Sequence, residues 1–207
     1  MKKNKDRQLD DLSIPVYQII TDDFEERAME NFSDKPEFDV TRFFFKNKTQ
    51  SFSQRMWNGM IMAIQSAGEH DDVIVVCSQK HLFTEVYNKD FLVNCIIEAN
   101  TSGVNLLFGG IGSFTNVVPV TENLFWIDSV TYFDFFIIYR SIFKSILEEQ
   151  FVENDDFFSK VCSITSNKLT MYPFITNIPT NSYSPKMNSS NNNLRKVQSI
   201  YWSYILE

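Results

Sequence analysis

Apolar residues gather along the chain in short continuous runs, separated by stretches with helical periodicity. The clearest run covers residues 73–77, five apolar positions without a polar break. Such a run, rich in β-branched residues, is typical of a strand buried on both faces. Ligands bind at the carboxyl ends of such strands in open α/β sheets. The first candidate site residues are therefore the four polar ones that follow the run: Ser78, Gln79, Lys80 and His81.

The same pattern predicts alternating strands and helices. One helix is expected after Ser51, which forms a capping box with Gln54, and is expected to close at Gly68. A second is expected over residues 89–102, and residues 153–167 form a polar connection. Strands are predicted over residues 15–21, 38–45, 73–77, 104–108, 114–120, 124–127, 135–139 and 169–175, and the run over 135–139 passes into a helix.

This alternation predicts an α/β three-layer sandwich with a Rossmann-like, mostly parallel sheet. We expect one domain over residues 14–176 and a disordered lead over residues 1–13. Asn, Ser, Pro and Thr dominate after residue 177, which predicts a polar loop and a short terminal helix over residues 177–207.

Composition and charge narrow the choice of partners. The net charge of -7 argues against a nucleic-acid partner, because phosphate backbones bind a basic face. A nucleotide-sugar needs only a local site and stays compatible. Three cysteines without metal spacing, and no secretory signal, predict buried reduced thiols and a cytoplasmic location. The longest apolar stretch is too short to span a bilayer, so membrane contact would be peripheral or through a partner enzyme.

Several segments, in this order, resemble the bacterial glycosyltransferase family 25 group over roughly residues 14–185. The resemblance is carried by the strand over residues 15–21 followed by Glu26-Arg27, by Trp57, by residues 72–77 with His81-Leu-Phe-Thr, by Gly109-Gly-Ile-Gly, by Val118-Pro-Val-Thr-Glu-Asn, by Trp126-Ile-Asp128, by Phe135 to Tyr139, by Asp155-Asp156 and by Met171-Tyr-Pro-Phe-Ile175.

The resemblance implies a GT-A-like fold, a nucleotide-sugar donor and a saccharide acceptor, in the synthesis of cell-surface polysaccharide or lipopolysaccharide. The family usually holds Mn²⁺ or Mg²⁺ on an acidic motif that ends the buried strand, where the ion neutralises the diphosphate. In this chain the three acidic positions are Ser78, Gln79 and Lys80, so we assign no metal ligands. A lysine can replace the ion by pairing with phosphate oxygens. Acidic residues at 22 and 23, after the first strand, also depart from the family pattern.

The expected donor site and catalytic groups follow from these segments. For the base that deprotonates the acceptor, the first candidate is Asp128 and the second is Asp156; the alternatives are a strand-end cap and a solvated acidic loop. Each of three donor-site candidates also has a structural alternative. His81 can be a structural loop histidine, Lys80 a solvated lysine, and Arg27 an arginine on a helix face. The residues expected to bind the donor are Thr21, Arg27, Gln79, Lys80, His81 and Gly110.

An active enzyme of this kind would invert the anomeric centre in a single displacement. Two other functions stay open. A homologue without the acidic motif can be inactive and bind a glycan, a nucleotide or a protein. An unrelated α/β interaction module is the other alternative, and it would have no cleft at the end of the strand over residues 73–77.

Overall fold

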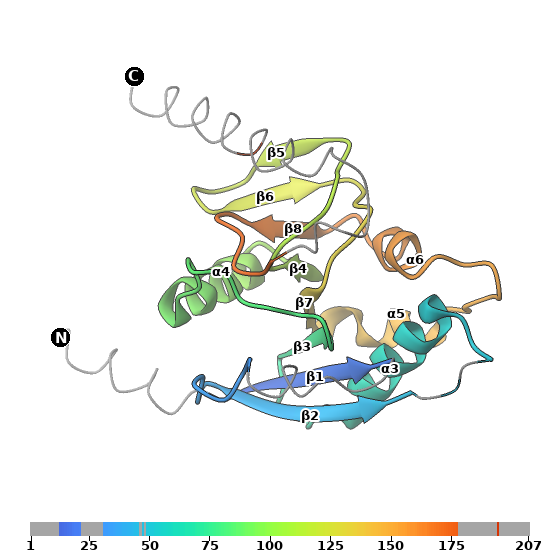
Figure 1. The fold of residues 1–207 in the computed structure, drawn as a ribbon. Coiled ribbons are helices and arrows are strands. Elements are labelled where there is room, and N and C mark those ends of the chain that lie inside the picture. Colours follow the sequence, from blue (N-terminus) through green and yellow to red (C-terminus); the bar gives the residue numbers. More distant parts are fainter. Residues whose placement is uncertain (1–12, 22–30, 46, 48, 178–193, 195–207) are drawn as a thin grey trace, which may run out of the picture.

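The computed structural model describes residues 13–21, 31–45, 47, 49–177 and 194. Eight strands form one sheet in the order β2-β1-β3-β7-β4-β8-β6-β5 (Figure 1). The strands are β1 (Ile14–Ile20), β2 (Phe38–Phe44), β3 (Val73–Ser78), β4 (Leu106–Phe108), β5 (Val117–Pro119), β6 (Leu124–Ile127), β7 (Phe135–Tyr139) and β8 (Lys168–Met171). The helices are α3 (Phe52–Ser66), α4 (Lys89–Thr101), η1 (Arg140–Ile142), α5 (Phe143–Glu148) and α6 (Phe157–Ser163).

Six of the eight strands run in one direction, and β6 and β7 run opposite to them. The pairs β1–β2, β1–β3 and β4–β8 are parallel. Strand β7 pairs antiparallel with both β3 and β4, and β6 pairs antiparallel with both β5 and β8. The predicted α/β fold class is confirmed, and the two reversed strands make the sheet mixed. Nearly all of the expected lead and tail, residues 1–13 and 177–207, lies outside the described residues.

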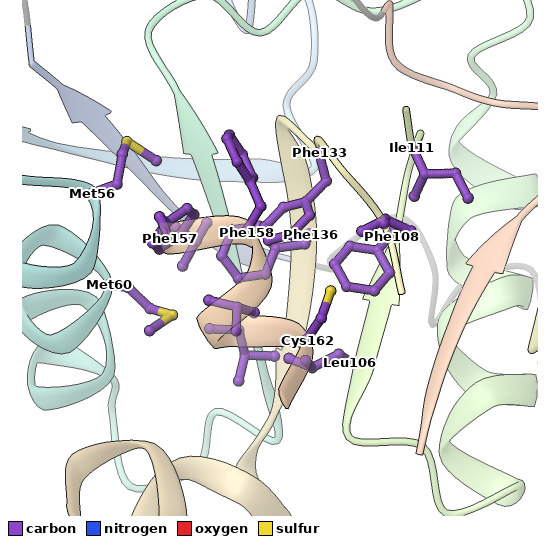
Figure 2. Close-up of a cluster of buried hydrophobic side chains, with 14 of the residues drawn as sticks. Met56, Met60, Leu106, Phe108, Ile111, Phe133, Phe136, Phe157, Phe158 and Cys162 are labelled. Atoms are coloured by element: carbon purple, nitrogen blue, oxygen red, sulfur yellow. The ribbon is translucent and has the colours of Figure 1, made fainter. Parts of the chain in front are cut away.

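Helices cover both faces of the sheet, so the three predicted layers are present. Helix α4 packs on one face through Leu92, Cys95 and Ile96, and α3, α5 and α6 pack on the other (Figure 1). The core beneath α3 and α6 is aromatic and sulfur-rich. Figure 2 shows its members from α3, α6 and the sheet region: Met56, Met60, Leu106, Phe108, Ile111, Phe133, Phe136, Phe157, Phe158 and Cys162. Burial of all three cysteines confirms the prediction for the thiols.

The start of helix α3 follows the predicted capping pattern. The Ser51 hydroxyl accepts a hydrogen bond from the Gln54 amide at 3.1 Å, which satisfies one of the first free amides of the helix. Farther along α3, a Cβ on Gly59 would lie 2.7 Å from Cδ1 of Ile19 in β1. The glycine therefore allows α3 to approach the sheet closely.

The prediction of a polar connection over residues 153–167 is wrong, because this segment contains α6. Asp156 caps the helix, and the side chains of Phe157, Phe158, Val161 and Cys162 are buried. A helix of seven residues is too short to be stable alone, and packing against the core supports it. Among the described residues, no helix is long and apolar enough to cross a membrane.

We expect Gly59→Val to destabilise the protein by about 1–3 kcal/mol, because the added methyl groups would force buried Ile19 and β1 away from α3. Chemical denaturation followed by circular dichroism measures the change. Gln65→Val places the same residue on an exposed position of α3 and should cost much less. Equal losses in the two variants would show that the helix–sheet contact at Gly59 is not the cause.

Candidate functional site

A hydrogen-bonded turn joins the carboxyl ends of β1 and β3. The Thr21 amide donates to Oε1 of Gln79 at 2.9 Å, and the Gln79 amide donates to the carbonyl of Ile19 at 3.0 Å. The Lys80 amide donates to the Ser78 hydroxyl at 3.0 Å, and the Lys80 side chain lies at the surface. Three residues predicted to bind the donor, Thr21, Gln79 and Lys80, are therefore brought together at one edge of the sheet.

A buried carboxyl group lies beside this turn. Because β7 runs antiparallel to β3, the residue before β7 meets the end of β3, and the Ser78 amide donates to the Asp134 carbonyl at 3.1 Å. The Asp134 residue is 3% exposed, and neither carboxylate oxygen has a well-formed hydrogen bond from the described residues. Burial raises the pKa of Asp134 to about 6, while the nearby Ser78 groups and the charge of Lys80 lower it.

Sequence reasoning missed Asp134. It lies in the run Tyr132-Phe-Asp-Phe-Phe136, which on its pattern alone is most simply sheet core. The available signal was one charged residue inside an aromatic run, because buried charges are rare and often functional. The position of Asp134 beside Ser78 depends on the antiparallel direction of β7, which the sequence did not indicate.

Gly110 lies at the same edge, beyond the end of β4, and its role is close packing. A Cβ there would lie 2.5 Å from the Thr176 hydroxyl oxygen and 2.9 Å from the Thr176 carbonyl oxygen. The Ile175 amide donates to the Gly109 carbonyl at 2.9 Å, which fixes the segment after β8 against the segment after β4. The buried Thr176 hydroxyl has no hydrogen-bond partner among the described residues. Gly110 is thus near the candidate site, with Thr176 against it.

The structure places His81 inside an aromatic cluster and not at the surface. Its ring is fully buried, 4.4 Å from the ring centroid of Phe83, 4.8 Å from that of Phe135 and 5.5 Å from that of Phe32. Burial, with a smaller effect of the Lys35 charge, lowers the pKa of His81 to about 3, so the ring stays neutral. A neutral ring with aromatic rings around it carries no charge for a diphosphate, and we leave His81 out of the donor site.

Asp128 lies at the opposite edge of the sheet. It follows β6, and β6 runs antiparallel, so its carboxyl end lies where β8 begins. Asp128 accepts hydrogen bonds from the Thr115 hydroxyl at 2.6 Å, from the Asn116 side-chain amide at 2.6 Å and from the Ser129 amide at 2.6 Å. Desolvation raises its pKa, but these bonds outweigh it and hold the pKa of Asp128 well below its usual range. Asp128 therefore has the contacts of a strand-end cap, and the structure does not bring it to Lys80.

Asp156 and Arg27 complete the residues expected from the sequence. Asp156 is exposed and caps α6, where its carboxylate accepts from the Ser159 amide at 2.9 Å. It lies near the start of α3, because the Phe157 amide donates to the Ser53 hydroxyl at 3.2 Å. Arg27 lies outside the described residues.

The residues at the edge do not match the donor set that Mn²⁺ or Mg²⁺ requires. These ions take several oxygen ligands, usually with more than one carboxylate. At the end of β3 the described residues supply one buried carboxylate, Asp134, and the ammonium group of Lys80 would repel a cation. No group of three or more His, Cys, Asp or Glu side chains that could hold a metal ion occurs in the part of the chain that the structure describes.

Solved structures are similar to this chain at 10% sequence identity or less. No protein-family model and no curated protein matches it. A solved structure of A197 from STIV has a TM-score of 0.54 at 10% identity, over 76% of this chain and 81% of that chain. An apo UDP-glucose pyrophosphorylase has a TM-score of 0.44 at 9% identity, over 97% of this chain and 85% of its own. A 4-diphosphocytidyl-2C-methyl-D-erythritol synthase of Anaerococcus prevotii has a TM-score of 0.41 at 7% identity, over 91% of this chain and 99% of its own.

These likenesses bear on the fold alone. At 10% identity the likeness to A197 shows a shared α/β architecture. TM-scores below 0.5 are too low for the two enzymes to carry any argument about this chain, its fold included. The functional hypothesis therefore depends on the residues at the carboxyl edge.

We expect the change in free energy of unfolding caused by Asp134→Asn to be more favourable at pH 7.5 than at pH 4. The folded pKa of about 6 exceeds the ordinary value of 3.8, so the folded chain loses stability as pH rises through this window, and the loss is complete above it. For a fully buried group the loss is up to about 3 kcal/mol. The variant cannot ionise at this position and should escape the loss.

Urea denaturation of the wild type and the variant at both pH values measures the difference. Asp39→Asn makes the same substitution on an exposed strand position and is the matched control. An Asp134→Asn effect that is equal at pH 4 and pH 7.5 would show that Asp134 is not a buried carboxyl with a raised pKa.

Proposed function

We propose that this protein binds a nucleotide-sugar at the carboxyl edge of its sheet and transfers the sugar to a saccharide acceptor. The observation that carries the proposal is the convergence of Thr21, Gln79, Lys80 and buried Asp134 at the ends of β1 and β3 and the start of β7. The carboxyl ends of parallel strands are where open α/β sheets bind nucleotides. No family model matches the chain, and our reason for proposing sugar transfer is the order of short segments that resemble glycosyltransferase family 25.

Lys80 is the residue we assign to the diphosphate. Its ammonium group lies on an exposed side chain, while its backbone is fixed by the hydrogen bond from its amide to Ser78. A charge-assisted hydrogen bond to a phosphate oxygen would offset the charge that develops as the diphosphate leaves. Thr21 and Gln79 fix the neighbouring backbone, and we assign them to the wall of the donor site.

Asp134 is a better candidate for the base than Asp128. A general base acts best when its pKa is near the working pH, and burial raises the pKa of Asp134 toward neutrality. In the proposed step the Asp134 carboxylate takes the proton of the acceptor hydroxyl. The hydroxyl oxygen then bonds to the anomeric carbon, and the bond from that carbon to the phosphate oxygen breaks. The electron pair leaves with the nucleoside diphosphate. Asp156 remains the second candidate.

The setting follows from the resemblance to the family. We propose that the acceptor belongs to a cell-surface polysaccharide or lipopolysaccharide and that transfer takes place on the cytoplasmic side. A second function is favoured by one observation: Ser78, Gln79 and Lys80 replace the acidic motif of the family. A protein without that motif can bind a nucleotide or a glycan without turnover.

We expect UDP or a UDP-sugar to bind in the absence of divalent metal, and Lys80→Ala to weaken this binding about tenfold or more. Loss of a hydrogen bond to a charged group typically costs about 1.5–3 kcal/mol. Isothermal titration calorimetry with EDTA or with Mn²⁺ measures the affinity. Lys144→Ala is the matched control, because Lys144 is an exposed lysine on α5.

Two results would contradict this site. One is binding that requires Mn²⁺, and the other is Lys80→Ala binding as tightly as Lys144→Ala. Transfer assays then separate the two functions. Release of UDP that depends on acceptor, and that Asp134→Asn abolishes while UDP binding persists, identifies the transferase. UDP binding without release under any acceptor identifies the binding protein.

A further inference from the structure

A hollow of about 380 Å³ opens at the other edge of the sheet, where β1 and β3 begin. Its walls come from the starts of these strands, from the last turns of α4 and from Tyr139 at the end of β7. A volume of this size is within the range of small-molecule sites. The hollow lies at the opposite end of β3 from Ser78 and Lys80, so it is separate from the proposed donor site.

Part of the lining of the hollow is apolar. Val73, Val93, Ile96 and Ile97 line it, and Ile97 is 55% exposed on the solvent side of α4. Tyr139 is also in the lining, and its hydroxyl is already used in a hydrogen bond of 2.8 Å to the Ile96 carbonyl. A ligand here would therefore gain affinity from an apolar body.

The mouth of the hollow is acidic. Asp71, Asp72 and His70 line it, whereas no Lys or Arg does so among the described residues. With a net charge of -7 on the whole chain, this mouth would repel phosphates and carboxylates. It would attract a cation, because two carboxylates stand next to an apolar surface.

The acidic loop is fixed in position by Arg140. The Arg140 Nε donates to the Asp71 carbonyl at 2.7 Å, the Arg140 amide donates to the Asp72 carbonyl at 2.9 Å, and Nη2 donates to the Gly68 carbonyl. The Gly68 amide in turn donates to Oδ2 of Asp71 at 2.6 Å. The guanidinium group donates to backbone carbonyls of the loop, so the backbone that carries the two carboxylates is held in place. Such a preformed rim lowers the cost of ordering on binding.

We propose that this hollow binds an amphipathic organic cation, an amine attached to a hydrocarbon or aromatic body. The apolar body lies against Val93 and Ile97, and the ammonium group lies at Asp71 and Asp72. This ligand differs in charge from a nucleotide-sugar, so the proposal does not depend on the function of the carboxyl edge.

Octylamine is a direct probe, compared with octanoate and octanol, which have a similar chain and a different charge. Titration of the full-length protein, followed by NMR, should show saturable shifts around Val93 and Ile97 with octylamine and much weaker binding of the other two. Asp72→Asn should weaken octylamine binding about fivefold, the upper range for an exposed ion pair. Glu85→Gln, an exposed acidic residue in the segment after β3, should leave it unchanged.

Ile97→Ser tests the apolar contact independently, and it should weaken octylamine without unfolding the protein, because Ile97 is largely exposed. Any of three binding results would overturn the proposal: octanoate or octanol binding as tightly as octylamine, Asp72→Asn behaving like Glu85→Gln, or no saturable octylamine binding. Octylamine-independent self-association that covers Ile97 would also overturn it, since a second copy would then occupy the hollow.

Discussion

The antiparallel insertion of β7 between β3 and β4 determines what this sheet can do at its carboxyl edge. In an all-parallel sheet, only strand ends would meet there. Because β7 is reversed, its first residues meet the end of β3, and the Ser78 amide donates to the Asp134 carbonyl. A carboxyl group is thereby buried beside a lysine-bearing turn. The chemistry that we propose for this edge depends on that one reversal.

Burial of polar groups is concentrated near this edge, and burial has a free-energy cost. Asp134, His81 and Thr176 are all buried, and the described residues provide no well-formed hydrogen bonds to their side chains. Protein interiors normally satisfy such groups, so these positions stand out. The three groups differ in role. His81 is a neutral ring among aromatic rings, Thr176 packs against Gly110, and Asp134 is a carboxyl group whose pKa is raised by burial to about 6.

The sequence allowed most of the fold to be predicted, because buried apolar runs and the Ser51 cap are local signals. Thr21 and Gln79 were both expected in the donor site, and the parallel pairing of β1 with β3 brings them together. Strand direction is not a local signal, and this is why the sequence did not reveal that Asp128 lies away from Lys80 or that Asp134 lies beside Ser78. Burial of His81 depends on Phe32 and Phe135, which are distant in sequence. The α6 helix depends on the packing of its buried face against the core. With seven residues it is too short to give a clear helical pattern in the sequence.

The most direct measurement is the mapping of UDP on the protein by ¹H–¹⁵N NMR in the presence of EDTA. If the carboxyl edge is the donor site, the largest amide shifts will be those of Thr21, Gln79 and Lys80, with smaller shifts near Asp134. The amides around Asp128 and around Asp72 will then stay unchanged, because both lie at the opposite edge. Shifts that centre on either of those two regions, or no shifts at high UDP concentration, would contradict the assignment of this edge.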